Sequence, residues 1–319
     1  MTPSARKFRL QTILAFGLVY VLWGSTYLAI RIAVENIPPL MMGATRFLIS
    51  GALMLVWRAA TGNPIRVSPR DMLRLTAIGA LLLIAGNVVL GWAETIIPTG
   101  LAALLIAVTP LWFLLLEHFS RRGDHLSTRG IAGIVLGLIG VVVLVWPDIT
   151  GAVRVGRGEL FGAALIMVSS FSWACGSVLS KRWHIRVDPY TASGWEMLSA
   201  GAINLVLSIG AGDLHKTVWA RNSVWAIVYL VFAGSMIGFT AYVWLLRNVP
   251  TPKVATYAYV NPIVAVFLGW LVLGEKITPY IAAGSVVVIA SVAIVTRAKA
   301  HTAPDDDEPE LPPVEATGD

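Results

Sequence analysis

Apolar residues along this chain gather into runs of about twenty, separated by short polar connections. The runs cover residues 11–30, 39–58, 75–93, 99–117, 130–146, 159–180, 189–210, 224–246, 252–273 and 280–296. A helix of about 20 residues rises roughly 30 Å, which is the thickness of the hydrocarbon core of a membrane. Strands of a membrane barrel would instead alternate polar and apolar residues. The pattern predicts an all-α integral membrane protein with ten transmembrane helices.

The composition agrees with a membrane protein. Of the 319 residues, 56% are hydrophobic and only 13% are charged, and the mean hydropathy is +0.74. The connections between the runs are too short to hold a soluble domain. A single cysteine, Cys175, excludes an intramolecular disulfide and leaves the redox compartment open.

The last segment of the chain differs from the rest. Beyond Arg297 it turns polar and rich in proline and acids, and it ends in PDDDEPELPPVEATGD. Such a segment cannot build a hydrophobic core. We expect residues 298–319 to form a disordered, acidic cytoplasmic tail, and recruitment of a partner by this tail is the alternative.

Lysine and arginine in the connections predict the orientation. With the N-terminus in the cytoplasm, about 17 of these residues fall on the cytoplasmic side and about 6 on the other, because positive charge favours the inside. This split predicts that both termini are cytoplasmic and that the number of crossings is even.

The two halves of the chain match each other weakly but along their whole length. At shifts of 150 to 152 residues the matching pairs are Trp23 with Trp173, Pro39 with Pro189, Gly51 with Gly201, Gly86 with Gly238, and Pro110 with Pro262. We therefore expect two five-helix repeats, 11–146 and 159–296. Five crossings are an odd number, so the second repeat would be inverted, as in many secondary transporters.

Arg46 lies inside the second apolar run, where an ionised guanidinium costs from roughly 3 to above 10 kcal/mol. At a shift of 150 it corresponds to Glu196. We expect the two side chains to face the same interior space and to neutralise each other when no substrate is bound. The alternatives are a permanent ion pair that locks the halves together, or separate polar pockets for the two charges.

Other polar and aromatic residues inside the runs are candidates for a substrate cavity. These residues are Asn87, Tyr257, Tyr259 and Asn261, with Trp23 and Trp173 at matching places in the two repeats. Helix breaks are expected at Pro110 and Pro262, because proline leaves a backbone carbonyl without its helical donor. Simple kinks and helix packing are the alternatives. Glu94 is expected at a solvated helix end near the outer interface.

No enzyme motif is present. The chain has no HExxH, GxSxG, GxxxxGK[ST] or CxxC sequence, and its five histidines lack metal-ligand spacing. We expect no enzymatic activity, no cofactor and no metal site. Without a nucleotide-binding motif, any pumping would be driven by a gradient or by exchange.

Three stretches carry a resemblance to a known family. They are WGSTYLAIRIAVENIPPLMMGATRFLISGALML, SSFSWACGSVLSKR and ATYAYVNPIVAVFLGWLVLGEKIT. Over residues from about 12 to 296 the chain resembles the EamA-type families of the drug/metabolite transporter superfamily, with the YedA-type inner-membrane proteins as the nearest subgroup. The resemblance implies ten helices in two inverted EamA repeats around a central cavity, and export of small metabolites across a bacterial inner membrane.

The chain departs from two other branches of that superfamily. The first run has no acid, unlike the small multidrug members, and the ninth run has only Lys253, unlike the phosphate-ester branches. We therefore expect an alternating-access exporter of amino acids or related zwitterions, in which Arg46 binds a carboxylate and Glu196 an ammonium. The rivals are an exporter of lipophilic drugs and a non-transporting scaffold or sensor. The expected partners are a small-molecule substrate and the bilayer, without nucleic acid, for a monomer or homodimer.

Overall fold

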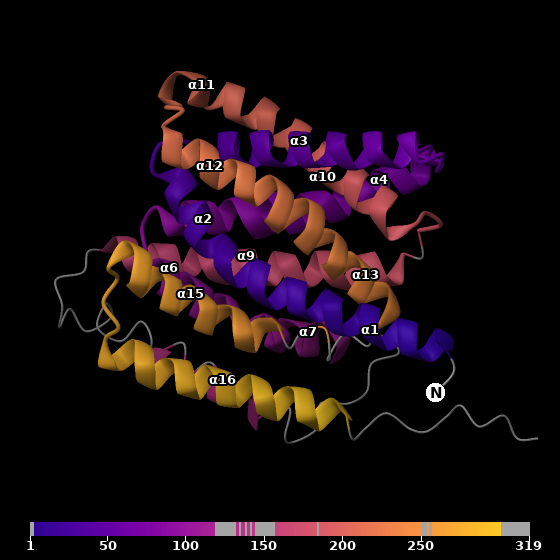
Figure 1. Ribbon diagram of the computed structural model, residues 1–319. Helices are drawn as coiled ribbons and strands as arrows, with labels where there is room; N and C mark the ends of the chain where they lie inside the picture. Colours follow the sequence, from indigo (N-terminus) through magenta and orange to yellow (C-terminus); the bar gives the residue numbers. More distant parts are fainter. Residues whose placement is uncertain are drawn as a thin grey trace, which may run out of the picture.

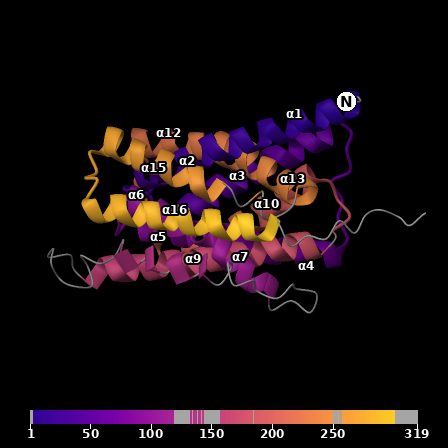
Figure 2. The same ribbon diagram turned by 90° about the horizontal axis from the view of Figure 1, so that it is seen from below.

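The computed structural model describes residues 3–118, 132–133, 135–137, 139–140, 142–143, 157–183, 185–249, 254 and 257–300. All of the elements found in these residues are helices. The helices lie side by side as a bundle (Figures 1 and 2). The predicted fifth run lies mostly outside the described residues, as does nearly all of the expected acidic tail, 298–319.

The described residues from Pro3 to His118 form four helical units. The first unit joins α1 (Pro3–Leu18), a π-helical stretch η1 (Val19–Trp23) and α2 (Gly24–Val34). The others are α3 (Pro39–Ala60), the continuous helix made of α4 (Pro69–Gly79), π-helical η2 (Ala80–Val88) and α5 (Val89–Glu94), and the pair α6 (Thr99–Ile106) and α7 (Thr109–His118).

The second half repeats this order. Its elements are α9 (Arg157–Arg182), α10 (Pro189–Gly210), the short α11 (Asp213–Lys216), the continuous helix made of α12 (Arg221–Tyr229), π-helical η3 (Leu230–Phe239) and α13 (Thr240–Asn248), then α15 (Tyr257–Leu273) and α16 (Pro279–Ala300). The first residue of α1 and the last of α16 lie at the same end of the bundle (Figure 1).

Five of the described helices are long and apolar enough to cross a membrane. They are Arg6–Val34, Pro39–Ala60, Pro69–Glu94, Gly158–Arg182 and Arg221–Asn248. Three shorter apolar helices, Thr99–Phe113, Val260–Leu273 and Pro279–Ser291, accompany them. The protein is therefore an all-helical membrane protein. The sequence pattern predicts ten transmembrane helices, whereas five helices among the described residues are long and apolar enough to cross a membrane.

The helices α3 and α10 form the most extensive contact in the bundle, and they run antiparallel. A Cβ atom added to Gly51 would lie 2.5 Å from the backbone nitrogen of Leu198, and one added to Gly201 would lie 2.5 Å from that of Leu48. A Cβ added to Gly194 would meet Leu55. The residue numbers of these contacts fall along α10 as they rise along α3, which shows that the two helices are antiparallel. Glycine permits this close backbone approach because it has no side chain.

The π-helical stretches η2 and η3 occupy matching places in the two halves. Ala80–Val88 and Leu230–Phe239 begin 150 residues apart, each in the middle of a long helix. Such stretches rotate the following residues around the helix axis and are frequent at functional sites. Both stretches carry cavity residues, as described below.

Asp188 stabilises the start of α10 and ties it to α3. Its carboxylate accepts hydrogen bonds from the backbone nitrogens of Tyr190 and Thr191, at 3.0 and 3.1 Å, and lies 3.0 Å from Nη2 of Arg58. Burial raises the pKa of Asp188, but the hydrogen bonds from Thr191 and the Arg58 guanidinium outweigh burial and lower it below its ordinary value. The folded protein therefore favours the ionised carboxylate.

Replacing Asp188 with asparagine should destabilise the protein by about 1 kcal/mol at neutral pH, because asparagine can still cap the helix but loses the charge pair. A lowered pKa gives stability above the ordinary pKa and loses it as pH falls through the lowered value. The difference from wild type should thus shrink below about pH 4. Thermal unfolding in detergent measures it. Asp71→Asn, which removes an ion pair within one helix, should cost less, and an equal cost would contradict the interhelical role.

Candidate functional site

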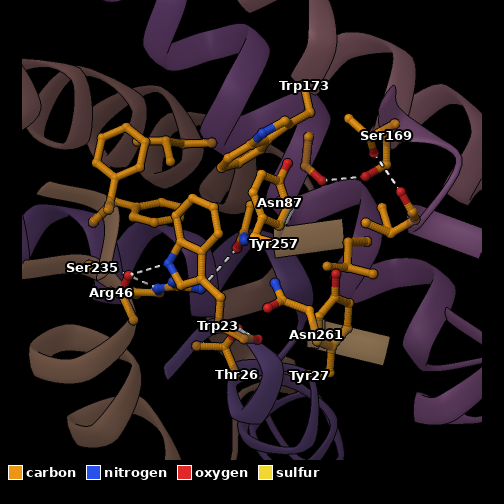
Figure 3. Close-up of a pocket in the computed structure, with 18 residues that line it drawn as sticks. Trp23, Thr26, Tyr27, Arg46, Asn87, Ser169, Trp173, Ser235, Tyr257 and Asn261 are labelled. Atoms are coloured by element: carbon orange, nitrogen blue, oxygen red, sulfur yellow. Dashed lines mark hydrogen bonds between the residues drawn. The ribbon is translucent and has the colours of Figure 1, made fainter. Parts of the chain in front are cut away.

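A cavity lies in the middle of the bundle, between the two main clusters of buried apolar residues. Its polar lining comes from α2, α3, η2, α7, α9, η3 and α15. The polar residues are Thr26, Tyr27, Arg46, Asn87, Thr109, Ser169, Ser235, Tyr257 and Asn261, and the aromatic rings of Trp23, Phe47, Trp173 and Phe239 complete the wall. Figure 3 shows these side chains converging from helices of both halves of the chain.

The cavity is small in this conformation. The space open to the centres of water molecules is about 60 Å³. One water needs roughly 10–15 Å³ by this measure. The cavity therefore holds a handful of waters, and a ligand with several non-hydrogen atoms would have to displace them or widen the space.

Arg46 is the charged group of this cavity. Its side chain is 4% exposed. Its Nε donates to Oγ of Ser235 at 2.8 Å, and its Nη1 donates to Oδ1 of Asn87 at 2.9 Å (Figure 3). A Cβ added to Gly234 would lie 2.9 Å from Nη2, so a glycine is needed to leave room for the guanidinium.

Arg46 has no ion-pair partner among the described residues, and Nη2 donates to none of their acceptors. The two bonds it does make go to a hydroxyl and to an amide oxygen, which carry no charge. A buried cation without a counter-ion is costly, and an anion that supplies the missing acceptors relieves that cost. Arg46 is therefore a candidate anion-binding group of the cavity.

An aromatic cluster borders the cavity next to Arg46. Trp23 and Trp173 meet edge to face with ring centroids 5.3 Å apart, and Trp23 meets Tyr257 in the same way at 5.5 Å. Nε1 of Trp23 donates to the carbonyl of Gly234, and Nε1 of Trp173 donates to Oη of Tyr242, both at 3.1 Å. These bonds fix the indole rings, and their faces offer an apolar surface for a ligand.

The helix made by α6 and α7 is interrupted at the level of the cavity. α6 ends at Ile106 and α7 begins at Thr109, one residue before Pro110. Oγ1 of Thr109 donates to the carbonyl of Ile106, and Thr109 lines the cavity. By contrast, α15 continues through Pro262, so the expected break there is wrong. Pro262 lies in the second turn of α15, where one missing hydrogen bond does not end the helix.

Six of the eight predicted binding or gating residues line the cavity together. They are Trp23, Arg46, Asn87, Trp173, Tyr257 and Asn261. With its amide nitrogen as donor, Asn261 reaches the carbonyls of Tyr20 at 3.1 Å and Tyr257 at 3.3 Å. Its amide therefore joins α15 to η1. The side chain of Tyr259 lies outside the described part of the structure.

Glu196 does not share the cavity with Arg46, and the expected ion pair between them is not formed. The contacts of Gly51 with Leu198 and of Gly201 with Leu48 mark where α3 and α10 cross. Arg46 and Glu196 each precede this crossing in their own helix, and because the helices are antiparallel, the two residues lie on opposite sides of it. Glu196 is 1% exposed, its Oε2 has no hydrogen-bond partner among the described residues, and its charge interacts with that of Arg247.

Several cavity residues were not singled out from the sequence. Ser235 orients Arg46, and Ser169 donates to the carbonyl of Gly86. Behind the lining, Tyr242 joins Trp173 to Ser177. In the sequence these residues are recognisable only as polar residues within apolar runs. Many such residues only donate a hydrogen bond to a backbone carbonyl of their own helix. The π-helical stretches, which aim Asn87 and Ser235 inward, have no simple sequence signature.

Comparison with known proteins gives the family. The model of the EamA-like transporter family matches residues 10–146 and again 160–297. The chain is 38% identical over 302 residues to the uncharacterized inner membrane transporter YedA of Escherichia coli (strain K12), covering 92% of this chain and 94% of the relative. It is 26% identical over 286 residues to a probable amino-acid metabolite efflux pump of the same strain, covering 87% and 92%.

The fold and the enclosed polar cavity are those of a membrane transporter. The chain belongs to the EamA-like transporter family. A solved crystal structure shares the fold, with a TM-score of 0.66 and 23% identity, covering 91% of this chain and 98% of the other.

Proposed function

We propose that this protein is a secondary transporter that exports small metabolites, amino acids or related zwitterions, across a bacterial inner membrane by alternating access. The observation that carries the proposal is Arg46, a buried cation without an acidic partner among the described residues, set in an enclosed cavity. It would bind the carboxylate of the substrate. The two relatives named above, an inner membrane transporter and a probable amino-acid metabolite efflux pump, support this function.

The ammonium group of an amino acid needs a partner other than Glu196, which was expected to bind it. Glu196 lies outside the cavity, so the ammonium would be bound by the faces of Trp23 or Trp173 and by neutral oxygens of the lining. Aromatic faces attract cations by about 0.5–2 kcal/mol, depending on desolvation. Glu196 then keeps a gating role on the other side of the crossing between α3 and α10, where it interacts electrostatically with Arg247.

The proposed architecture is ten transmembrane helices in two inverted repeats, 11–146 and 159–296, with both termini cytoplasmic and 298–319 as an acidic cytoplasmic tail. Three observations support it. The family model matches the chain twice. The corresponding helices α3 and α10 pack antiparallel through corresponding glycines. The described chain begins and ends at the same end of the bundle.

The position of the cavity supports alternating access. One buried cluster, which includes Tyr27, Ile30 and Ile97, closes it toward one end, and a second, which includes Tyr242 and Leu245, closes it toward the other. Opening one cluster at a time would expose Arg46 to each side of the membrane in turn.

A flux measurement tests the proposal. Inner-membrane vesicles with and without the protein are loaded with a mixed metabolite pool, and release is followed by mass spectrometry. We expect selective release of carboxylate-bearing compounds, amino acids first. Release of lipophilic cations or neutral drugs alone would favour the drug-exporter alternative, whose basis is the aromatic wall. No selective release, with intact protein present, would contradict transport of this pool.

A further inference from the structure

Another buried acidic residue, Glu94, lies outside the cavity, at the end of α5. Glu94 is 0% exposed. Neither Oε1 nor Oε2 has a hydrogen-bond partner among the described residues. The expectation of a solvated helix end is therefore wrong, because neighbouring helices cover the carboxyl group.

Two charged side chains act on Glu94, and neither supplies a hydrogen bond to its carboxyl group. Arg31 on α2 donates through Nη1 to the backbone carbonyl of Glu94. Glu275, which follows α15, accepts from the backbone nitrogens of Thr99 at 2.8 Å and Gly100 at 3.1 Å. Its two oxygens therefore occupy the N-terminus of α6, where a negative charge is stabilised.

The carboxyl group of Glu94 should carry a proton. Burying an ionised carboxylate without donors is costly, and Glu94 has none among the described residues. Arg31 favours ionisation of Glu94 and Glu275 opposes it, but the cost of burial is the largest of the three effects.

We propose that Glu94 is a proton-binding site of the transporter, protonated in this closed conformation and deprotonated when the end of the bundle that contains it opens to water. The site takes one proton from water and returns it to water. Its link to transport rests on the proposed function.

Tyr27 connects this site to the substrate cavity. It lines the cavity (Figure 3), is 6% exposed, and interacts electrostatically with Glu94. It also lies four residues before Arg31, so both side chains share one face of α2. A change in the charge of Glu94 therefore changes the electrostatic potential at Tyr27, in the wall of the cavity.

The other helices packed on α5 add few charges. On α3 these are Arg46 in the cavity and Arg58 at the far end. On α9 they are Arg157, Glu159, Lys181 and Arg182, and the side chain of Arg157 lies outside the described part of the structure. Neither η2 nor α6 carries a charged residue. Arg31 and Tyr27 on α2, and Glu275 after α15, act electrostatically on Glu94.

Infrared spectroscopy tests the protonation directly and needs no substrate. Spectra of the full-length protein in lipid nanodiscs at neutral pH are compared between wild type and Glu94→Gln. We expect the difference spectrum to contain the C=O stretch of a protonated carboxyl group. The matched control is Glu35→Gln at an exposed position at the end of α2, whose difference spectrum should lack the band of a protonated carboxyl group.

A difference spectrum for Glu94→Gln that contains carboxylate bands but no band of a protonated carboxyl group would overturn the proposal. If that variant does not fold, wild type labelled with ¹³C-glutamate replaces it, and absence of a shifted protonated-carboxyl band at neutral pH would be equally decisive against it. A protonated Glu94 in a protein without metabolite flux would support the proton site and contradict the proposed transport. Flux that responds to an imposed pH gradient in wild type but not in Glu94→Gln would support the link to transport.

Discussion

Replacing Arg46 with alanine should abolish release of the carboxylate-bearing compounds that wild-type vesicles export. Losing a buried, hydrogen-bonded partner of a carboxylate costs about 2–5 kcal/mol, which is roughly a 30-fold to several-thousand-fold loss of affinity. The measurement is the mass-spectrometric release assay, with binding of a released compound by calorimetry as the second readout.

Two further variants separate charge from geometry. Arg66→Ala removes an exposed arginine in the connection after α3 and should leave release unchanged. Arg46→Lys keeps the charge but loses the planar fork held by Ser235 and Asn87, so its release should be intermediate. Normal release from Arg46→Ala would show that the anion site is not on the substrate path.

The Arg46→Ala variant should be at least as stable as the wild type. Arg46 is buried without an acidic partner among the described residues, so its removal also removes an uncompensated desolvation cost. We expect the midpoint of thermal unfolding of Arg46→Ala to equal or exceed that of wild type. A protein that folds at least as well and fails to transport would place the role of Arg46 in binding rather than in folding.

The sequence reveals Arg46 and its neighbours because polar residues stand out in apolar runs. Trp23 and Trp173 also match each other at the repeat distance, and in the structure their rings are in contact. What the linear pattern lacks is the rotation of each helix about its axis. Arg46 bonds Ser235 and not Glu196, because antiparallel packing places the two charges on opposite sides of the crossing between α3 and α10.

Glu94 illustrates a second limit. It ends an apolar run, and ends of runs are usually solvated at the membrane interface. Glu94 is buried because α2 and α9 pack against α5, and because Glu275, a residue distant in sequence, bonds the nearby start of α6. None of these neighbours is close to Glu94 in sequence, so only the tertiary arrangement could place it in the interior.

The close contact of α3 with α10 gives the prediction with the largest effect on stability. Gly51→Ala and Gly201→Ala should each destabilise the protein by about 1–3 kcal/mol or more, because the new Cβ would clash with backbone rather than with a flexible side chain. Gly17→Ala in α1 is the control: its Cβ meets nothing within 4 Å, so the better helix propensity of alanine should leave stability equal or slightly higher.

The pair of variants also tests the proposed inverted repeats. Gly51 meets Leu198, and Gly201 meets the corresponding Leu48, so a twofold relation between the helices makes the two substitutions equivalent. Thermal unfolding in detergent should give losses of similar size for both. If one variant were as stable as wild type while the other lost folded protein, the contact would not be symmetric, and the support that it lends to two inverted repeats would be removed.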